Sequence, residues 1–251
     1  IYIIYILYTM YYVHIGYIMS EKLDGMRAYW CGSKLWSRSG LQIMAPDWFL
    51  EDLPSDLELD GELFLGRKQF DECMSIARRT DASGEWNKLT YIVFDAPTVS
   101  GGILSRLEGA SGALKSTAKY VKVHPHRICN GIEHLLESLA VMEGLGGEGL
   151  MLRRATATHV PGRTTDLLKV KSFHDDEALV TGYEEGKGKY SKAVGSLVCV
   201  SKAGACFKVG SGLTDQQRIY GNAPKIGDVI EYRYFELTKD GIPRFPTFAR
   251  I

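Results

Sequence analysis

The residues most able to do chemistry lie between Glu21 and Arg27, where Lys22 is followed by Asp24, Gly25 and Arg27. A lysine that acts as a covalent nucleophile must lose its proton, although the ordinary pKa of a lysine ammonium is about 10.4. A site that uses it surrounds the amine with a low dielectric or with other cations. The same residues also fit a surface strand that ends in an Asp-Gly turn, so this segment alone leaves both interpretations open.

Four further segments follow in the chain, and each places charged or aromatic residues within an apolar run. They are Glu58–Leu63, Tyr91–Asp95, Gly147–Arg153 and Leu167–Lys171. In this order and at these separations, the five segments resemble the five motifs of the covalent nucleotidyltransferases, which include ATP-dependent DNA ligases, RNA ligases and mRNA capping enzymes. The resemblance is greatest to the small, bacterial-type (E-class) ATP-dependent DNA ligases. It covers residues 19–251, and the segments that carry it are 20–27, 146–154, 166–171, 186–190 and 243–246.

The resemblance implies a fold and its division into domains. The expected fold class is α+β, with a nucleotidyltransferase (adenylation) domain of antiparallel sheets and flanking helices, followed by a small OB-fold β-barrel. We expect an uncertain leader over residues 1–18, the adenylation domain over 19–172 and the OB-fold domain over 177–251. Regular turns between short β-rich runs after residue 177 independently favour a five-stranded barrel.

The implied reaction seals nicks with a 5′-phosphate and a 3′-hydroxyl in duplex DNA, using ATP and Mg²⁺ or Mn²⁺. Lys22 is the expected nucleophile, which becomes covalently bound to AMP. Phosphoryl transfer needs mostly positioning and charge neutralisation. Lys169 and Lys171 are two positions apart on a predicted strand, so they share one face and suit the α-phosphate. Glu62 and Glu148 are hard oxygen donors that suit the metal ion, and Glu62 also suits the ribose.

Further roles follow from the resemblance alone. Phe94 is expected to stack on adenine, although without the neighbouring motifs it would fit an ordinary strand core. Glu21 is expected to reach the adenine edge. Arg27 and Arg38 are expected to hold the ribose and the 5′-phosphate of the nick, although Arg38 also fits a solvated surface position. The expected DNA-binding residues are Asp24, Arg38, Lys187 and Lys189.

Lys187 and Lys189 belong to the basic, glycine-rich segment 186–190, which suits contact with a phosphate backbone. A solvent-exposed Gly-Lys turn with no ligand would have the same sequence pattern, so this alternative stays open. The formal net charge of the 251 residues is zero, but residues 1–150 hold 14 Lys/Arg and 19 Asp/Glu, whereas residues 151–251 hold 16 and 11. A basic second part beside an acidic first part suits phosphate binding at one end and metal binding at the other.

The remaining residues argue mainly against other sites. The five cysteines are scattered, so we expect reduced thiols, and His124 and His126 are expected on a surface strand rather than at a metal. Residues 1–20 carry no Asp, Glu, Lys or Arg but six tyrosines, which favours a strand over a membrane helix. No convincing signal peptide precedes Lys22, and the compartment (cytoplasm, organelle or periplasm) stays open.

Periodicity predicts the elements that position these residues. Helices are expected over 70–79 and 132–142, the second capped by Asn130 and Glu133. Residues 172–177 read as a hinge. Strands are expected over 27–36, 57–65, 89–95, 149–153, 167–170, 178–183, 196–201, 206–209, 229–235 and 247–251.

The expected partner is nicked duplex DNA, bound by a monomer, with no protein partner deducible and no membrane association expected. Two other enzyme classes, RNA ligases and capping guanylyltransferases, share the lysine chemistry and remain alternatives. A non-enzymatic alternative is an inactive relic that binds nucleotides or nucleic acid.

Overall fold

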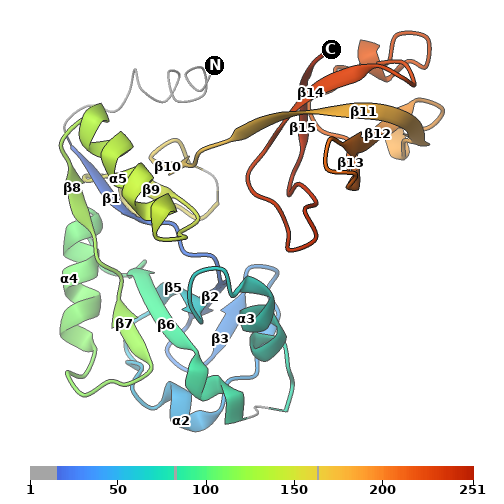
Figure 1. The fold of residues 1–251 in the computed structure, drawn as a ribbon. Helices are drawn as coiled ribbons and strands as arrows, with labels where there is room; N and C mark the ends of the chain where they lie inside the picture. Colours follow the sequence, from blue (N-terminus) through green and yellow to red (C-terminus); the bar gives the residue numbers. More distant parts are fainter. Residues whose placement is uncertain (1–15, 82–83, 163) are drawn as a thin grey trace. The chain divides into compact units, whose positions relative to one another are not determined.

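A computed structural model describes residues 16–81, 84–162 and 164–251. The chain divides at Lys171/Ser172 into two compact units, which are described separately (Figure 1). Most of the expected leader, residues 1–15, lies outside the described residues. Tyr17 and Ile18 were also assigned to that leader, but they are buried in the first strand, β1 (Tyr17–Glu21), and form part of the core. In the described ranges, no helix combines the length and apolar composition that a membrane crossing requires.

A six-stranded sheet forms one half of the first unit, with the strand order β4-β3-β2-β5-β6-β7. Its strands are antiparallel neighbours except for β6 and β7, which pair in parallel. Buried Trp86, Tyr91 and Leu35 lie in its core, and α3 (Phe70–Ala77) packs on β2 and β5. The strands are β2 (Met26–Trp30), β3 (Leu35–Ser37), β4 (Gln42–Ile43), β5 (Leu59–Phe64), β6 (Thr90–Asp95) and β7 (Val121–Val123).

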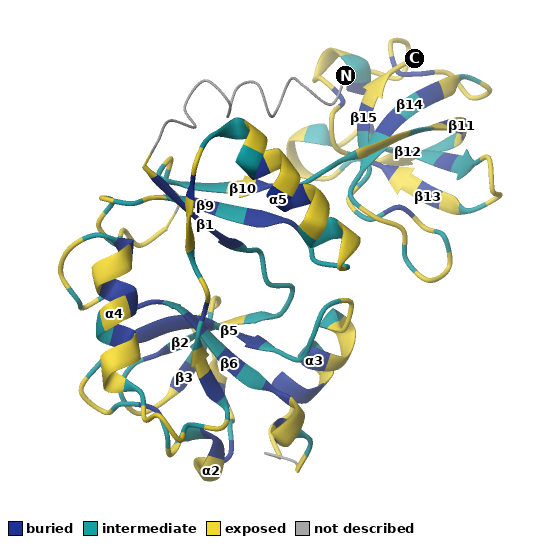
Figure 2. Ribbon diagram, turned by 60° about the vertical axis from the view of Figure 1, so that its left-hand side comes forward, coloured by how far each residue is buried: buried dark blue, intermediate teal, exposed yellow. Residues whose placement is uncertain are grey.

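A four-stranded antiparallel sheet forms the other half, with the order β10-β9-β1-β8. It comprises β8 (Arg127–Cys129), β9 (Leu150–Arg154) and β10 (Leu167–Val170) around β1. Leu135 and Leu139 of α5 (Ile132–Gly144) pack with the buried side chains of this sheet, and Figure 2 shows buried residues along β1 and β9. Both sheets therefore have a protected face, which holds their strands rigidly. The other helical segments of this unit are α2 (Asp47–Leu50), α4 (Ile103–Ala113) and the 3-10 turn η1 (Gly84–Lys88).

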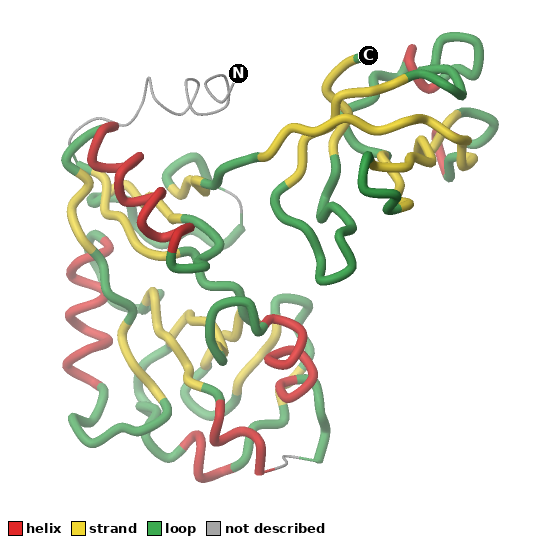
Figure 3. The backbone as a smooth tube through the Cα atoms, in the orientation of Figure 1, coloured by secondary structure: helices red, strands yellow, loops and turns green. Residues whose placement is uncertain are grey.

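The second unit is built on one five-stranded antiparallel sheet, with the order β13-β12-β11-β14-β15 (Figure 3). The sheet curls so that Ser211, beyond β13, forms an isolated parallel bridge with Thr247 at the start of β15. One bridge does not close a barrel, so this is an OB-like sheet that is only partly closed. Its strands are β11 (His174–Glu185), β12 (Val194–Ser201), β13 (Cys206–Val209), β14 (Val229–Tyr234) and β15 (Thr247–Arg250), with 3-10 turns η2 (Gly188–Tyr190) and η3 (Gln216–Arg218).

Several local predictions are wrong. The run 27–36 is a hairpin of β2 and β3 rather than one strand, because Cys31–Lys34 turn between them. The expected hinge 172–177 is shorter, since β11 already begins at His174. Helix α5 has Gly131 at its N-cap with no side-chain cap, and the Asn130 backbone N–H instead donates to His134 Nδ1 at 3.1 Å.

His124 and His126 are also not on an exposed strand. His124 is buried just after β7, and its Nε2 lies 2.9 Å from the carbonyl oxygen of Glu21. The ring therefore ties the segment after β7 to the end of β1. The thiols are free as expected, but only Cys73, Cys129 and Cys199 are buried.

Candidate active site

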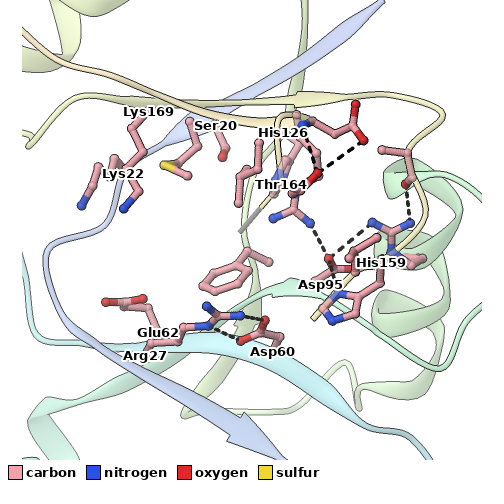
Figure 4. Close-up of a pocket in the computed structure, with 18 of the residues that line it drawn as sticks. Ser20, Lys22, Arg27, Asp60, Glu62, Asp95, His126, His159, Thr164 and Lys169 are labelled. Atoms are coloured by element: carbon pink, nitrogen blue, oxygen red, sulfur yellow. Dashed lines mark hydrogen bonds and ion pairs between the residues drawn. The ribbon is translucent and has the colours of Figure 1, made fainter. Parts of the chain in front are cut away.

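A cavity of about 280 Å³ lies in the first unit and is lined by residues of both sheets. Figure 4 shows Ser20, Lys22 and Lys169 on one side, with Arg27, Asp60 and Glu62 facing them from the other. Apart from Lys171, every residue that the sequence predicts for nucleotide binding lines this cavity. These residues are Glu21, Lys22, Arg27, Arg38, Glu62, Phe94 and Lys169.

The four-stranded sheet forms one wall of the cavity, and the register of its strands aligns the side chains there. Lys169 of β10 lies opposite Met151 of β9, and Met151 lies opposite Ser20 of β1. Residues directly opposite each other in an antiparallel pair point to the same face, so these three side chains form a row. All three line the cavity, and Lys22 follows one residue after the end of β1.

The six-stranded sheet supplies the facing wall. Arg27 of β2 and Glu62 of β5 lie opposite each other in the ladder, and Phe94 comes from β6. Gly25 allows the lysine segment to approach β5 closely, because a Cβ atom there would lie 2.2 Å from the Leu63 carbonyl oxygen. The glycine of the Lys-x-Asp-Gly pattern is thus required by packing between the motif and the neighbouring strand.

Lys22 forms an ion pair with Glu148, and the other oxygen of that carboxylate pairs with Lys171. The backbone also joins these segments, since the Lys22 N–H donates to the Gly149 carbonyl at 2.9 Å. Glu148 and Lys171 lie just outside the cavity lining. The carboxylate predicted as a metal ligand therefore bridges the expected nucleophile and a second ammonium in this structure.

Burial and neighbouring charges shift the pKa values of two cavity residues, Glu62 and Lys169. Burial raises the pKa of Glu62 to about 8, although the charge of Lys22 opposes that shift. Burial also lowers the pKa of Lys169, and the positive charges of Lys22, Arg38 and Lys171 lower it further. A concentration of cations at this end of the cavity favours an anionic ligand such as a phosphate.

Two predicted ligand contacts are occupied by partners that the sequence did not indicate. The Arg27 guanidinium is held by buried Asp60, with Nε to Oδ1 at 3.0 Å and Nη2 to Oδ2 at 2.5 Å. Arg67 binds both oxygens of the Glu21 carboxylate at 2.8 and 3.0 Å. Asp60 fixes the direction of Arg27 at the cavity, whereas the Glu21 side chain is engaged by Arg67.

A buried cluster of charged side chains around Asp95 was also not predicted from the sequence. The Asp95 carboxylate accepts hydrogen bonds from Arg106 Nε at 2.6 Å and from Arg153, and His159 Nδ1 lies 3.3 Å away. Arg106 in turn donates to the Ala157 carbonyl at 2.8 Å. The cluster fastens the segment after β9 to the end of β6, and the Asp that follows Phe94 was its only signal in the sequence.

The predicted DNA-binding residues are dispersed. Arg38 is exposed and lines the cavity, whereas Asp24 does not. Lys187 and Lys189 lie in the second unit, where Lys189 Nζ is 3.3 Å from Asp215 Oδ2. The described residues contain no group of three or more His, Cys, Asp or Glu side chains arranged to hold a metal ion.

Residues 185–251 match the model of the DNA ligase OB-like domain. The chain is 36% identical over 236 residues to a DNA ligase of Haemophilus influenzae, covering 94% of this chain and 86% of the relative. A structure from a structure-function study of Lig E DNA ligases has a TM-score of 0.88 and 35% identity, covering 97% and 95% of the two chains. A Chlorella virus DNA ligase-adenylate has a TM-score of 0.55 and 24% identity, covering 95% and 92%.

Together, the two facing sheets, the lysine cavity and the OB-like unit define the fold of a covalent nucleotidyltransferase, which confirms the predicted fold class. The chain belongs to the DNA ligase family.

Proposed function

We propose that this chain seals nicks in duplex DNA with ATP, through an AMP bound covalently to Lys22. The main supporting observation is that Lys22 lines the cation-rich end of the cavity, where it pairs with Glu148 and its charge acts on Lys169. The 36% identity to a DNA ligase over nearly the whole chain favours DNA over the RNA ligase and capping alternatives.

Three displacements at phosphorus follow. The Lys22 amine attacks the α-phosphorus of ATP, so that a P–N bond forms and the bond to pyrophosphate breaks. An oxygen of the nick 5′-phosphate then attacks the AMP phosphorus, and the Lys22 amine leaves. Finally the 3′-hydroxyl attacks the 5′-phosphorus, which closes the strand and releases AMP.

The chain's own side chains supply positioning and charge. Glu148 is the base nearest to the Lys22 amine and holds it by a hydrogen bond until nucleotide enters. Lys169 and Lys171 neutralise phosphate charge as it develops during transfer. Phe94 and Met151 line the cavity from the two facing sheets and offer apolar surfaces for the two faces of a base.

Glu62 and Glu148 fit a magnesium site of the usual kind, in which one or two carboxylates act together with the phosphates of the nucleotide. A bound Mg²⁺ or Mn²⁺ would neutralise phosphate charge there. Since the described residues hold no metal cage of three side chains, we expect the metal to be bound together with ATP.

Incubation with ATP labelled at the α-phosphate, with and without Mg²⁺, tests the proposal. Peptide mapping should find the label on Lys22, and addition of nicked duplex DNA should discharge it as the strand is joined. Label on another lysine, or no label with ATP and Mg²⁺ present, would contradict the proposed function.

A further inference from the structure

His126 lies beside Ser20 at the cavity. Strands β1 and β8 are antiparallel, and their register places Met19 opposite Arg127. The ladder ends at this pair, and Ser20 and His126 are the next residue on each side; both line the cavity (Figure 4). His126 therefore lies at the β8 end of the row of lining residues that crosses the four-stranded sheet. In order, that row is Lys169, Met151, Ser20 and His126.

The two ends of this row have different charged neighbours. The positive charges of Lys22 and Arg38 act on Lys169, whereas His126 lies near Arg153 and the carboxylate of Asp95 that pairs with it. Lys169 stands with Lys22 at the cationic end, whereas His126 is three strands away, or about 14 Å at the usual strand spacing. A nucleotide whose α-phosphate meets Lys22 therefore extends its base toward Ser20 and His126. This step rests on the proposed function, because it takes the cavity as the nucleotide site.

The hydrogen bonding of His126 fixes its tautomer. Its Nδ1 lies 2.7 Å from the carbonyl oxygen of His124, and a carbonyl can only accept, so Nδ1 carries the hydrogen. A neutral imidazole has one N–H, which leaves Nε2 with a free lone pair. Burial lowers the pKa of His126 to about 4, so the ring is neutral at physiological pH.

We propose that Nε2 of His126 selects adenine by accepting a hydrogen bond from the exocyclic amine of the base. Guanine presents a carbonyl oxygen at that position, which would meet the histidine lone pair without a hydrogen between them. The Ser20 hydroxyl both donates and accepts, so it cannot make this distinction. His126 is thus a specificity-determining residue for 6-aminopurine nucleotides.

The test compares ATP with purine riboside 5′-triphosphate, which lacks only the exocyclic amine. Dissociation constants are measured by equilibrium titration of the full chain. The parent protein should prefer ATP by about tenfold, the usual effect of one such hydrogen bond. His126→Phe should reduce the preference to less than about twofold, whereas His126→Gln keeps an acceptor oxygen and should retain most of it. His134→Phe, on α5 and outside the cavity lining, is the matched control and should keep the full preference.

Equal binding of both nucleotides by the parent protein would overturn the proposal, as would a full ATP preference in His126→Phe. The two dissociation constants are compared within each variant, so a partial loss of folded protein affects both equally and leaves their ratio unchanged. Covalent labelling of the parent protein by ATP is followed in parallel. Its absence would refute the proposed function, while the binding ratio would still decide the role of His126.

Discussion

Lys22 and Glu148 form an ion pair although 126 positions separate them in the sequence. Strand pairing brings them together, since β1 and β9 align Glu21 with Leu150 just before and after these two residues. The amine is therefore restrained by the ion pair before any nucleotide binds. In the proposed reaction, attack of Lys22 on ATP requires this contact to open, so Glu148 would take part in positioning the nucleophile.

Replacement of Lys22 by alanine should abolish self-adenylation, because Lys22 is the proposed nucleophile and Lys171, whose amine also pairs with Glu148, follows β10 rather than β1. The variant should still close a nick that carries AMP on its 5′-phosphate, since only the third displacement remains. Gel assays with a pre-adenylated nick and an ordinary nick separate the two steps. Retained covalent labelling in Lys22→Ala would show that another residue is the nucleophile.

Glu148→Gln should lower the rate of self-adenylation by about 10²–10³, the usual effect of removing one preorganised electrostatic group. Glutamine keeps the size of the side chain but loses the charge shared by Lys22 and Lys171. Rates are measured across a magnesium titration. Glu143→Gln, on α5 and outside the cavity lining, is the control and should match the parent.

Glu62 should make the protein less stable as the pH rises. Its pKa is about 8 in the folded chain, against about 4.3 when unfolded, so between these values only the folded state keeps the proton. Stability should therefore fall with rising pH across this window, by up to about 1 kcal/mol per pH unit. Urea unfolding without nucleotide or magnesium at pH 5 to 8 measures the slope. Glu62→Gln should flatten it, and an unchanged slope would contradict the assignment.

The motif residues that line the cavity could be recognised in the sequence because each motif is local. Lys22, Glu62, Phe94 and Lys169 lie at or near the ends of short apolar strands, and those strands could be recognised from composition. Antiparallel pairing of the strands then brings these ends together at the cavity. The fold class came from the resemblance to the covalent nucleotidyltransferases, and the regular turns after residue 177 independently favoured a five-stranded second unit.

Contacts between side chains that are far apart in the sequence could not be predicted from it. Nothing near Asp95 indicates that Arg106 and Arg153 meet it, and nothing near Glu21 indicates Arg67. Helix α4 was not predicted because four glycines or serines interrupt its apolar spacing. Such contacts depend on how the two sheets face each other, which a single sequence does not state.

Asp95→Asn should destabilise the first unit by about 3–5 kcal/mol, since it leaves the buried guanidinium of Arg106 without its counter-charge. Burial works to raise the pKa of Asp95, but the hydrogen bond from Arg106 and the charge of Arg153 hold it below its ordinary value. Its stabilising effect is therefore present above the unfolded pKa and is lost as the pH falls. Urea unfolding at pH 7 measures the loss, and the exposed Asp56→Asn is the control. A change below about 0.5 kcal/mol would show that the cluster is not needed for stability.

Within the second unit, the segment 186–190 should govern the salt dependence of DNA binding. Lys187 and Lys189 are exposed, and Asp215 lies 3.3 Å from Lys189 Nζ and accepts a hydrogen bond from the Tyr190 hydroxyl. Asp215 therefore offsets part of the positive charge of this segment. If Lys187 and Lys189 contact phosphates, replacing both by glutamine should weaken binding and lower the slope of log K against log salt by about 2, one for each lysine.

Asp215→Asn should act in the opposite direction and tighten binding, because it leaves the Lys189 charge without its acidic neighbour. Fluorescence anisotropy with a nicked duplex at 50 to 200 mM salt, a range over which phosphate contacts lose affinity by orders of magnitude, measures both effects. Self-adenylation should change by less than about twofold, since the proposed ATP site lies in the first unit. Lys202→Gln, an exposed lysine of the same unit paired with Glu177, is the matched control. An equal loss of binding in Lys202→Gln would show that the effect is one of net charge and that the segment 186–190 has no special contact with DNA.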